Sequence, residues 1–433
     1  MSLPRYPEYK ASGVEWLGEV PGHWGRASLR WLSTRYSGGT PDKLNLDYWT
    51  DGTIPWLNSG EVNQSFVTEP STYITEEAFQ NSSAKWIPQG ALVMALAGQG
   101  KTKGMVAQLG IPTTCNQSMA AIIPTQEQDA RFLFWWLTSN YQNIRNMAGG
   151  DLRDGLNLEL LGNIPCPLAP LTEQQTIAAF LDRETGKIDV LIAEQRRLVE
   201  LLAEKRQAVI SHAVTKGLNP NIRMKDSGIE WLGEVPEHWA VKRLKFLCDV
   251  KTGDKDTVNA IDDGEYPFFV RSQTVERING FTFDCEAVLT AGDGVGVGKV
   301  YHYVNGKFDF HQRVYMMNNF RFVTGKFFFQ YLATTFHKVA LGGGAKSTVD
   351  SLRMPLFMNF EITVPPVDEQ TEIIDFIDSE TAKFDTLTSE ANRAIALLQE
   401  RRSALISAAV TGKIDVRRHT GEGRYPVDER ITA

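Results

Sequence analysis

The sequence predicts an α+β protein in which two globular modules follow each other in tandem and each leads into a long helix. One stretch, SGVEWLGEVPGHW at 12–24, returns almost unchanged as SGIEWLGEVPEHW at 227–239. A second repeated stretch, at 170–189 and 366–385, closes each of two dissimilar regions. These regions contain short β-like runs, so each is expected to fold as a mixed domain.

The composition is that of a folded protein with two or three domains. The chain has 433 residues, of which 42% are hydrophobic and 10% aromatic. Its four cysteines form neither a C-x-x-C pair nor a cluster with histidine, which argues against a disulfide framework and against bound metal. The first ten residues lack the apolar core of a secretory signal, and no apolar run approaches the ~20 residues that cross a bilayer. We therefore expect a cytoplasmic protein with no membrane partner.

The first repeat has the features of a hydrophobic anchor. Its apolar side chains would pack a short turn that Gly18 and Pro21 bend, the first copy contributing Trp16, Leu17, Val20 and Trp24. The segments expected along the chain are an anchor at 1–24, a globular domain at 25–170, a helix at 171–218, the repeated anchor at 219–239, a second globular domain at 240–366, a second helix at 367–415 and a flexible tail at 416–433.

The segment that follows the first globular domain is predicted to be one long amphipathic helix. Residues 174–214 contain no proline and a single glycine, and their apolar residues recur with gaps of 4, 7, 3, 7, 4 and 7, which is typical of a coiled coil. The second copy repeats this pattern. The predicted seam residues are Ile177, Leu181, Ile188, Leu191, Leu198, Leu202 and Val209, with Ile373, Ile377, Phe384, Leu387, Leu398 and Leu405.

A helix of roughly 60 Å, at about 1.5 Å per residue, needs an equally long partner for its apolar stripe. The obvious partner is the other copy. We therefore expect an antiparallel coiled coil that relates the two halves by a pseudo-twofold axis. The alternative is a pair of ordinary core helices in two unrelated domains.

The two dissimilar regions share a faint skeleton. Each has a Gly-x-Gly-Lys turn, at 98–101 and 296–299, followed by a glutamine, Gln117 or Gln312, and then by an aromatic helix. They are interpreted as divergent copies of one domain. A constant scaffold with divergent domains suggests a protein that reads two different things at a fixed separation.

One enzymatic interpretation depends on ALAGQGKT at 95–102, which is one residue short of a P-loop. A P-loop needs a helix after the Lys-Thr pair, and the residues that follow do not predict one. A glycine turn between two strands is favoured, but a P-loop-like nucleotide hydrolase using Lys101 and Thr102 stays open as an alternative. A protein-only coiled-coil scaffold is a third possibility. No methyltransferase motif, catalytic triad or nuclease carboxylate set is visible, so the chain is expected not to be an enzyme.

Polar residues in the predicted turns and strand ends are candidates for DNA contact, although a solvated edge strand is an alternative interpretation of 311–313. Arginine and glutamine form paired hydrogen bonds with guanine and adenine, and lysine contacts phosphate. The candidates are Thr40, Lys101, Lys103, Gln117, Arg271, Gln273, Lys299, His311, Gln312, Arg313, Lys346 and Ser347. With a net charge of −7, the chain should bind DNA weakly by itself.

Four features together resemble the specificity subunit of type I restriction-modification systems over nearly the whole chain. They are WLGEVPxHW present twice, SGGTP with IPWLNSGEV at 37–62, NQSMAAIIP, and TEQQTIAAFLD with its copy DEQTEIIDFID. In the second half KTGDKDT and GEYPFFVRSQ stand in place of SGGTP and IPWLNSGEV, so the two domains should read different sequences.

The resemblance implies two target-recognition domains, each reading half of a bipartite, asymmetric site in double-stranded DNA. It implies that the helices set the spacing between the half-sites and dock two modification (methyltransferase) subunits, which restriction (motor/nuclease) subunits then join. It also implies that this chain has no catalysis and no cofactor of its own. S-adenosylmethionine, ATP and magnesium would belong to the partner subunits.

Overall fold

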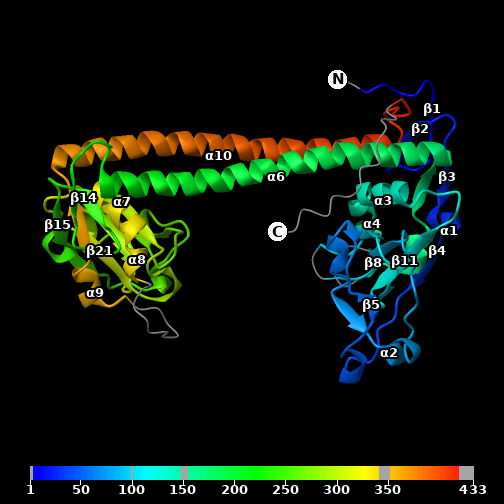
Figure 1. Ribbon diagram of the computed structural model, residues 1–433, viewed down its shortest axis with the longest axis horizontal. Coiled ribbons are helices and arrows are strands. Elements are labelled where there is room, and N and C mark those ends of the chain that lie inside the picture. Colours follow the sequence, from blue (N-terminus) through cyan, green and yellow to red (C-terminus); the bar gives the residue numbers. More distant parts are fainter. Residues whose placement is uncertain (1–2, 99–100, 148–154, 341–351, 419–433) are drawn as a thin grey trace. The chain divides into compact units, whose positions relative to one another are not determined.

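The computed structural model describes residues 3–98, 101–147, 155–340 and 352–418. The chain divides into two compact units: unit 1 comprises residues 1–194 and 394–433, and unit 2 comprises residues 195–393. Each unit joins one mixed domain to parts of two long helices, α6 (Leu171–Lys216) and α10 (Val367–Val410) (Figure 1). The prediction of an α+β protein with two modules and two long helices is confirmed.

Unit 1 is built around a five-stranded sheet. Its strand order is β4 (Ser33–Ser37), β11 (Met119–Pro124), β8 (Leu92–Ala95), β9 (Val106–Leu109) and β6 (Phe66–Val67). A three-stranded sheet has the order β10 (Thr114–Cys115), β5 (Ile54–Leu57) and β7 (Thr72–Ile74). Two pairs complete the strands: β1 (Tyr9–Ala11) with β2 (Glu19–Pro21), and β3 (Gly25–Ser28) with β12 (Pro165–Leu168).

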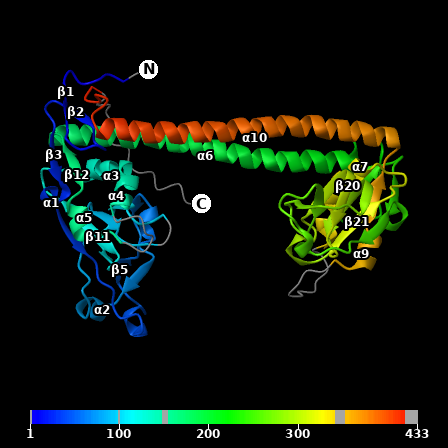
Figure 2. The same ribbon diagram turned by 180° about the vertical axis from the view of Figure 1, so that it is seen from behind.

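Short helices surround these sheets, and the most apolar of them faces α6. They are α1 (Leu29–Leu32), α2 (Glu76–Gln80), α3 (Ala130–Ser139), α4 (Tyr141–Asn146) and α5 (Leu158–Gly162), with 3-10 turns at Leu46–Tyr48 and Glu61–Asn63. Six consecutive residues of α3 are buried, Phe132 to Leu137, in the same core as Ile177 and Leu181 of α6. The two views in Figures 1 and 2 place β5 and α2 at the end of unit 1 that is farthest from α6.

Unit 2 repeats this plan with a six-stranded sheet. Its strand order is β16 (Asp249–Thr252), β21 (Val314–Asn318), β19 (Phe283–Ala291), β20 (Tyr301–Phe310), β17 (Tyr266–Phe269) and β18 (Glu276–Ile278). The paired strands are β13 (Met224–Asp226) with β14 (Glu234–Pro236), and β15 (Ala240–Arg243) with β22 (Glu361–Val364). The helices are α7 (Gly325–Thr335), α8 (His337–Ala340) and α9 (Met354–Met358), with 3-10 turns at Leu244–Phe246, Thr257–Asn259 and Gly294–Gly296.

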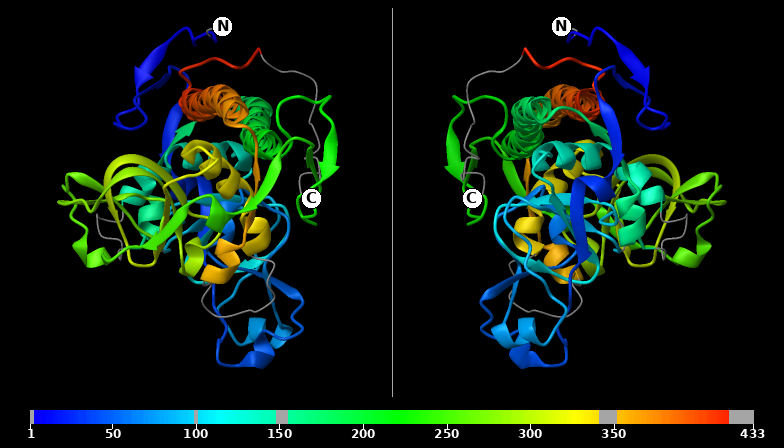
Figure 3. Two further views of the ribbon diagram at one scale, coloured as in Figure 1. Left: turned by 90° about the vertical axis from the view of Figure 1, so that its left-hand side faces the viewer. Right: turned by 90° about the vertical axis from the view of Figure 1, so that its right-hand side faces the viewer.

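In each unit the start of one long helix lies in the same core as the end of the other. Unit 1 buries Ile177 of α6 together with Ile406 of α10, and Arg402 Nε donates to Asp189 Oδ1 at 2.8 Å. Unit 2 buries Ile373 of α10 together with Ile210 of α6, and its ion pair joins Arg206 to Asp385. The two segments of each unit therefore run antiparallel. Figure 3 shows them end on, with the β1–β2 hairpin (blue) beside the C-terminal end of α10 (red).

Each long helix ends in a glycine with positive φ. Gly217 has φ of 77° and Gly412 has φ of 69°, a backbone conformation that favours glycine and satisfies the last carbonyls of a helix. A side chain at Gly412 would also meet Pro21 Cδ at 2.4 Å, so the glycine lets the helix end against the anchor.

Two further sequence expectations concern thiols and membranes. Burial raises the pKa of the Cys115, Cys166 and Cys248 thiols to about 12, which leaves them protonated at neutral pH. Within the described residues, no helix has both the length and the apolar character that crossing a membrane requires.

Candidate nucleic-acid interface

The two units build one corner of their sheets in the same way. In unit 1, β10 runs parallel to β5 and pairs Cys115 with Leu57; in unit 2, the end of β20 runs parallel to β17 and pairs Phe310 with Phe269. A glycine then packs on each of these strands. A Cβ at Gly38 would lie 2.0 Å from Cys115 O, and one at Gly253 would lie 2.2 Å from Phe310 O. No larger residue fits without moving the backbone.

The hydrogen bonds that leave this corner show which residues correspond. The Gln117 N–H donates to Thr40 Oγ1 at 3.5 Å, and the Gln312 N–H donates to Lys255 O at 2.8 Å. The residue after each glutamine accepts a backbone hydrogen bond of 2.8 Å. Leu96 N–H donates to Ser118 O, and Gly292 N–H donates to Arg313 O. Gln117 and Gln312, paired from the sequence, therefore occupy equivalent positions, and both are exposed.

In unit 2 this corner is charged. Arg271 Nη1 donates to Asp293 Oδ1 at 2.8 Å, and Arg313 Nη1 donates to Asp293 Oδ2 at 3.1 Å. Gln312 Nε2 donates to Asp256 Oδ2 at 2.6 Å. The structure thus brings together Arg271 and residues 311–313, which the sequence singled out. It adds two aspartates to them, Asp256 and Asp293.

His311 lies beneath this surface with its side chain buried. Its Nδ1 accepts the Arg313 N–H at 2.9 Å, so the neutral ring carries its proton on Nε2, which lies 3.9 Å from Asp256 Oδ1. Burial lowers the pKa of His311 below its ordinary 6.5, although Asp256 opposes this effect. His311 therefore orients the backbone of Arg313 and is not an exposed contact.

The remaining candidates of unit 2 are exposed or lie outside the described residues. Gln273 follows β17, and Lys299 follows the 3-10 turn that precedes β20; both are exposed. Lys346 and Ser347 lie outside the described residues.

In unit 1 the candidate residues are two lysines and two uncharged polar residues. Lys101 is exposed in the turn before β9, where its carbonyl accepts the Tyr141 hydroxyl at 2.6 Å. Lys103 is only 4% exposed, because the turn folds its side chain inward, and so does not offer an exposed phosphate contact. Thr40 is half-buried beside Gln117.

The segment that resembles a P-loop lies between β8 and β9, and its residues 99 and 100 are outside the described part of the chain. Met105 N–H donates to Thr102 O at 2.9 Å, Gly104 N–H donates to Ala95 O at 2.8 Å, and the chain continues directly into β9. The helix N-terminus that holds phosphate in a P-loop is not formed after Lys101 and Thr102, and the strand-turn-strand prediction is right.

The predicted seam residues divide into buried and exposed groups. Those buried or half-buried are Ile177, Leu181, Ile188, Leu202, Val209, Ile373, Ile377, Phe384, Leu398 and Leu405. Leu191, Leu198 and Leu387 are instead more than 40% exposed. A strict heptad selects Leu191, but the buried stripe of α6 passes through the adjacent Ile192. The stripe shifts because a helix has 3.6 residues per turn and the heptad assumes 3.5.

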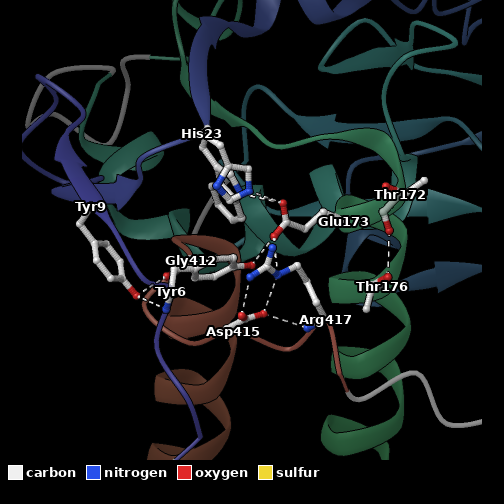
Figure 4. Close-up of polar contacts among 10 residues, drawn as sticks. Tyr6, Tyr9, His23, Thr172, Glu173, Thr176, Gly412, Asp415 and Arg417 are labelled. Atoms are coloured by element: carbon white, nitrogen blue, oxygen red, sulfur yellow. Dashed lines mark hydrogen bonds and ion pairs between the residues drawn. The ribbon is translucent and has the colours of Figure 1, made fainter.

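The anchors dock on the first turn of each long helix through a glutamate, buried in unit 1 and partly exposed in unit 2, a contact that the sequence reasoning missed. Glu173 is 5% exposed and accepts bonds from Tyr6 Oη at 2.6 Å, from His23 Nε2 at 2.8 Å and from Trp24 Nε1 at 3.0 Å (Figure 4). Arg417 Nε lies 3.7 Å from Glu173 Oε1. Burial, together with the bond to Glu173, raises the pKa of the Tyr6 hydroxyl.

Unit 2 repeats the central part of this arrangement. Glu369 accepts from His238 Nε2 at 2.7 Å and from Trp239 Nε1 at 3.0 Å. The signal was present in the sequence, since both His-Trp pairs and both glutamates belong to the repeated stretches. In unit 1 the segments before and after the module also contact each other here, because Asp415 N–H donates to Pro4 O at 2.7 Å.

The sequence was compared with known families and relatives. Residues 33–199 and 236–396 match the model of one family, the type I restriction modification DNA specificity domain. The chain is 30% identical over 181 residues to the EcoR124I/EcoR124II specificity subunit of Escherichia coli, a match covering 40% of this chain and 42% of that one. The matched part thus spans less than half of this relative. The StySPI specificity subunit of Salmonella potsdam is 21% identical over 429 residues, covering 92% of this chain and 90% of the relative.

Comparison with solved structures supports the same fold. One chain, from a study of complex assembly and conformational transition of the type I R-M system, superposes with a TM-score of 0.70. The match covers 90% of this chain and 98% of that one at 15% sequence identity. At this identity the likeness concerns the fold alone.

Proposed function

The chain belongs to the type I restriction-modification DNA specificity family, and from this premise we propose that its two units read the two halves of a bipartite, asymmetric site in double-stranded DNA. One observation carries the proposal. The same backbone corner occurs in both units but carries Asn116, Gln117 and Ser118 in one, and exposed Gln312 and Arg313 after the buried His311 in the other. A constant frame with different polar side chains is what two readers of different sequences require.

The chemistry of the corners supports contact with base edges in the major groove. The amides of Gln117 and Gln312 can each donate and accept at the edge of adenine, and the guanidinium of Arg313 can donate to guanine. Lys101 and Lys299 are exposed on adjacent turns, where they can contact phosphates and fix the position of each unit on the duplex. Because the chain carries a net charge of −7, tight binding would need the remainder of a complex.

The long helices are proposed to form an antiparallel coiled coil that fixes the spacing between the half-sites. The buried residues of α6 and α10 within each unit and the ion pair of Asp189 with Arg402 support this pairing. Exposed leucines at matching places of the two helices, Leu191 and Leu387, leave apolar surface that two modification subunits could cover.

Catalysis is proposed to reside in the partners. In this proposal two modification subunits supply adenine methylation with S-adenosylmethionine, and restriction subunits supply ATP- and magnesium-dependent cleavage. The chain contributes sequence recognition and no reaction step. Sequence similarity to the specificity subunits and the resemblance derived from the repeated motifs support this division of labour.

The experiment is an exchange of one reader. Residues 25–170 are replaced by the matching region of a related specificity subunit, and the methylated adenines of a host expressing the complete complex are mapped by sequencing. One half-site should change while the other half-site and the spacer stay the same. A change in both half-sites, or in neither, would contradict the proposal.

A further inference from the structure

Three charged residues of unit 2 stand where unit 1 carries three small residues. Strand pairing sets this correspondence, because Ala95 pairs with Met119 in unit 1 as Ala291 pairs with Val314 in unit 2. Asp293 lies two residues after Ala291, as Ala97 lies two residues after Ala95, so Asp293 corresponds to Ala97. In the same way Arg271, two residues after Phe269 in β17, corresponds to Ser59, two residues after Leu57 in β5, and Arg313 corresponds to Ser118.

The three charged side chains form one compact set at the surface. Asp293 is 21% exposed and each of its carboxylate oxygens accepts from a different guanidinium, Arg271 at 2.8 Å and Arg313 at 3.1 Å. The side chain of Arg313 is 56% exposed and that of Arg271 is 39% exposed. The guanidinium of Arg313 thus points outward while one of its nitrogens is held.

The backbone around this set is also fixed. The Arg313 N–H is bonded to the buried ring of His311, and a side chain at Gly296 would meet Arg271 O at 2.5 Å. Both arginines therefore start from positions set by close packing, and Asp293 removes much of the remaining freedom of their side chains. Ordering a long side chain before binding lowers the entropy lost on binding.

The carboxylate bonded to Arg313 favours a base over a phosphate as the ligand. A phosphate approaching Arg313 would also approach the carboxylate of Asp293, which repels it. A guanine edge instead presents two neutral acceptors, O6 and N7, which match the donors of a guanidinium. An aspartate beside an arginine thus weakens general attraction to DNA and keeps the geometry needed for a base.

We propose that Arg271, Asp293 and Arg313 form a guanine-reading element of unit 2. Arg313 donates to O6 and N7 of one guanine, Asp293 acts as a positioning residue that orients its guanidinium, and Arg271 holds Asp293 in place through its other carboxylate oxygen. The element rests on the proposed function, because it specifies what one of the two readers recognises. Ser59, Ala97 and Ser118 give unit 1 no such element at the same place.

The test uses the assembled complex of the full chain with its modification subunits. The target is first mapped from methylated adenines, and methylation and binding are then measured on duplexes that differ by one base pair in the half-site read by unit 2. The variants are Arg313→Ala, Arg313→Lys and Asp293→Asn. Arg277→Lys in the same unit, whose side chain bonds to Gly264 O and Glu265 O, serves as the matched control.

The expected result is a loss of discrimination at one guanine position. Arg313→Ala should reduce the preference for guanine there by roughly 10- to 100-fold and leave the half-site of unit 1 unchanged. Arg313→Lys should restore it only in part, because a lysine ammonium lacks the rigid planar fork that Asp293 orients. Asp293→Asn should lower the preference at the same position while raising affinity for unrelated DNA, which a purely structural role would not do.

Two results would overturn the element. The first is a unit 2 half-site that contains no guanine. The second is uniform weakening by Arg313→Ala on all duplexes, with the salt dependence reduced by about one charge, which identifies a phosphate contact. Failure of the proposed function is distinguishable, because exchange of residues 25–170 would then leave both half-sites in place.

Discussion

At the sheet corner that the two units share, unit 1 carries Asn116, Gln117 and Ser118 after β10, whereas unit 2 carries His311, Gln312 and Arg313 after β20. The backbone around them is the same, with a glycine packed on the strand and equal hydrogen bonds to the neighbouring strand. Unit 2 adds a buried histidine and an arginine pair around an aspartate. Glycine packing and strand register therefore fix the backbone of this corner, which leaves the outward side chains able to change.

The two units should lose similar amounts of stability when the buried tryptophan of either anchor is replaced. Trp24 and Trp239 are fully buried and both donate to the glutamate of a long helix. Replacing either by alanine should cost about 3–5 kcal/mol in its own unit, because each leaves a large cavity. Hydrogen exchange measured by mass spectrometry would localise the loss of protection to one unit at a time. A cost confined to one of the two variants would contradict a shared frame.

Replacing the anchor glutamates should destabilise the two units to different extents, because the surroundings of the glutamates differ. Glu173 is nearly inaccessible and has Tyr6 and Arg417 in addition to the histidine and tryptophan, whereas the side chain of Glu369 is 23% exposed. Glu173→Gln should cost about 3 kcal/mol and Glu369→Gln about 1 kcal/mol, since bonds to a buried charge contribute more.

Chemical denaturation of the full-length variants measures this difference. Glu194→Gln on the exposed face of α6 is the control and should change the free energy of unfolding by less than about 0.5 kcal/mol. Equal costs at Glu173 and Glu369 would show that the extra partners of Glu173 contribute nothing.

The histidines of unit 2 predict a pH dependence that unit 1 need not share. Burial lowers the pKa of His302 and His311 below the ordinary value of 6.5. As pH falls below about 6.5 the unfolded chain takes up these protons first, so the folded state of unit 2 loses stability, while above pH 7 both states are neutral and nothing changes. His302→Asn with His311→Asn should flatten the stability of unit 2 between pH 7.5 and 5.5. If the double variant shows the same pH dependence of unfolding free energy, these histidines do not cause it.

Much of the scaffold could be predicted from the sequence, because the anchor and the start of the long helix each occur twice in the chain. The repeated anchors and helices fixed the two modules, and β11 and α3 lie where apolar runs indicated them. The equivalence of Gln117 and Gln312 also followed from the shared order of features, since each glutamine follows a Gly-x-Gly-Lys turn. These features depend on local pattern, which a sequence displays directly.

What the sequence did not show depends on residues that meet only in the fold. Asp293 lies 20 residues or more from both arginines that it binds, and nothing in its own neighbourhood marks it as their partner. Burial of Lys103 and exposure of Leu191 likewise follow from packing and not from spacing. The glutamate that fixes each anchor was visible as a repeat, but its role needed the distance to His23.

The central claim is that one frame carries two interchangeable readers, and a chain with the same reader twice tests it most directly. Residues 240–366 are replaced by a second copy of 25–170, and methylated adenines are mapped in a host that expresses the complete complex. The expected target is palindromic, with the half-site of unit 1 in both arms and an unchanged spacer. Retention of the original asymmetric target, or loss of all methylation in a complex that still assembles, would contradict it.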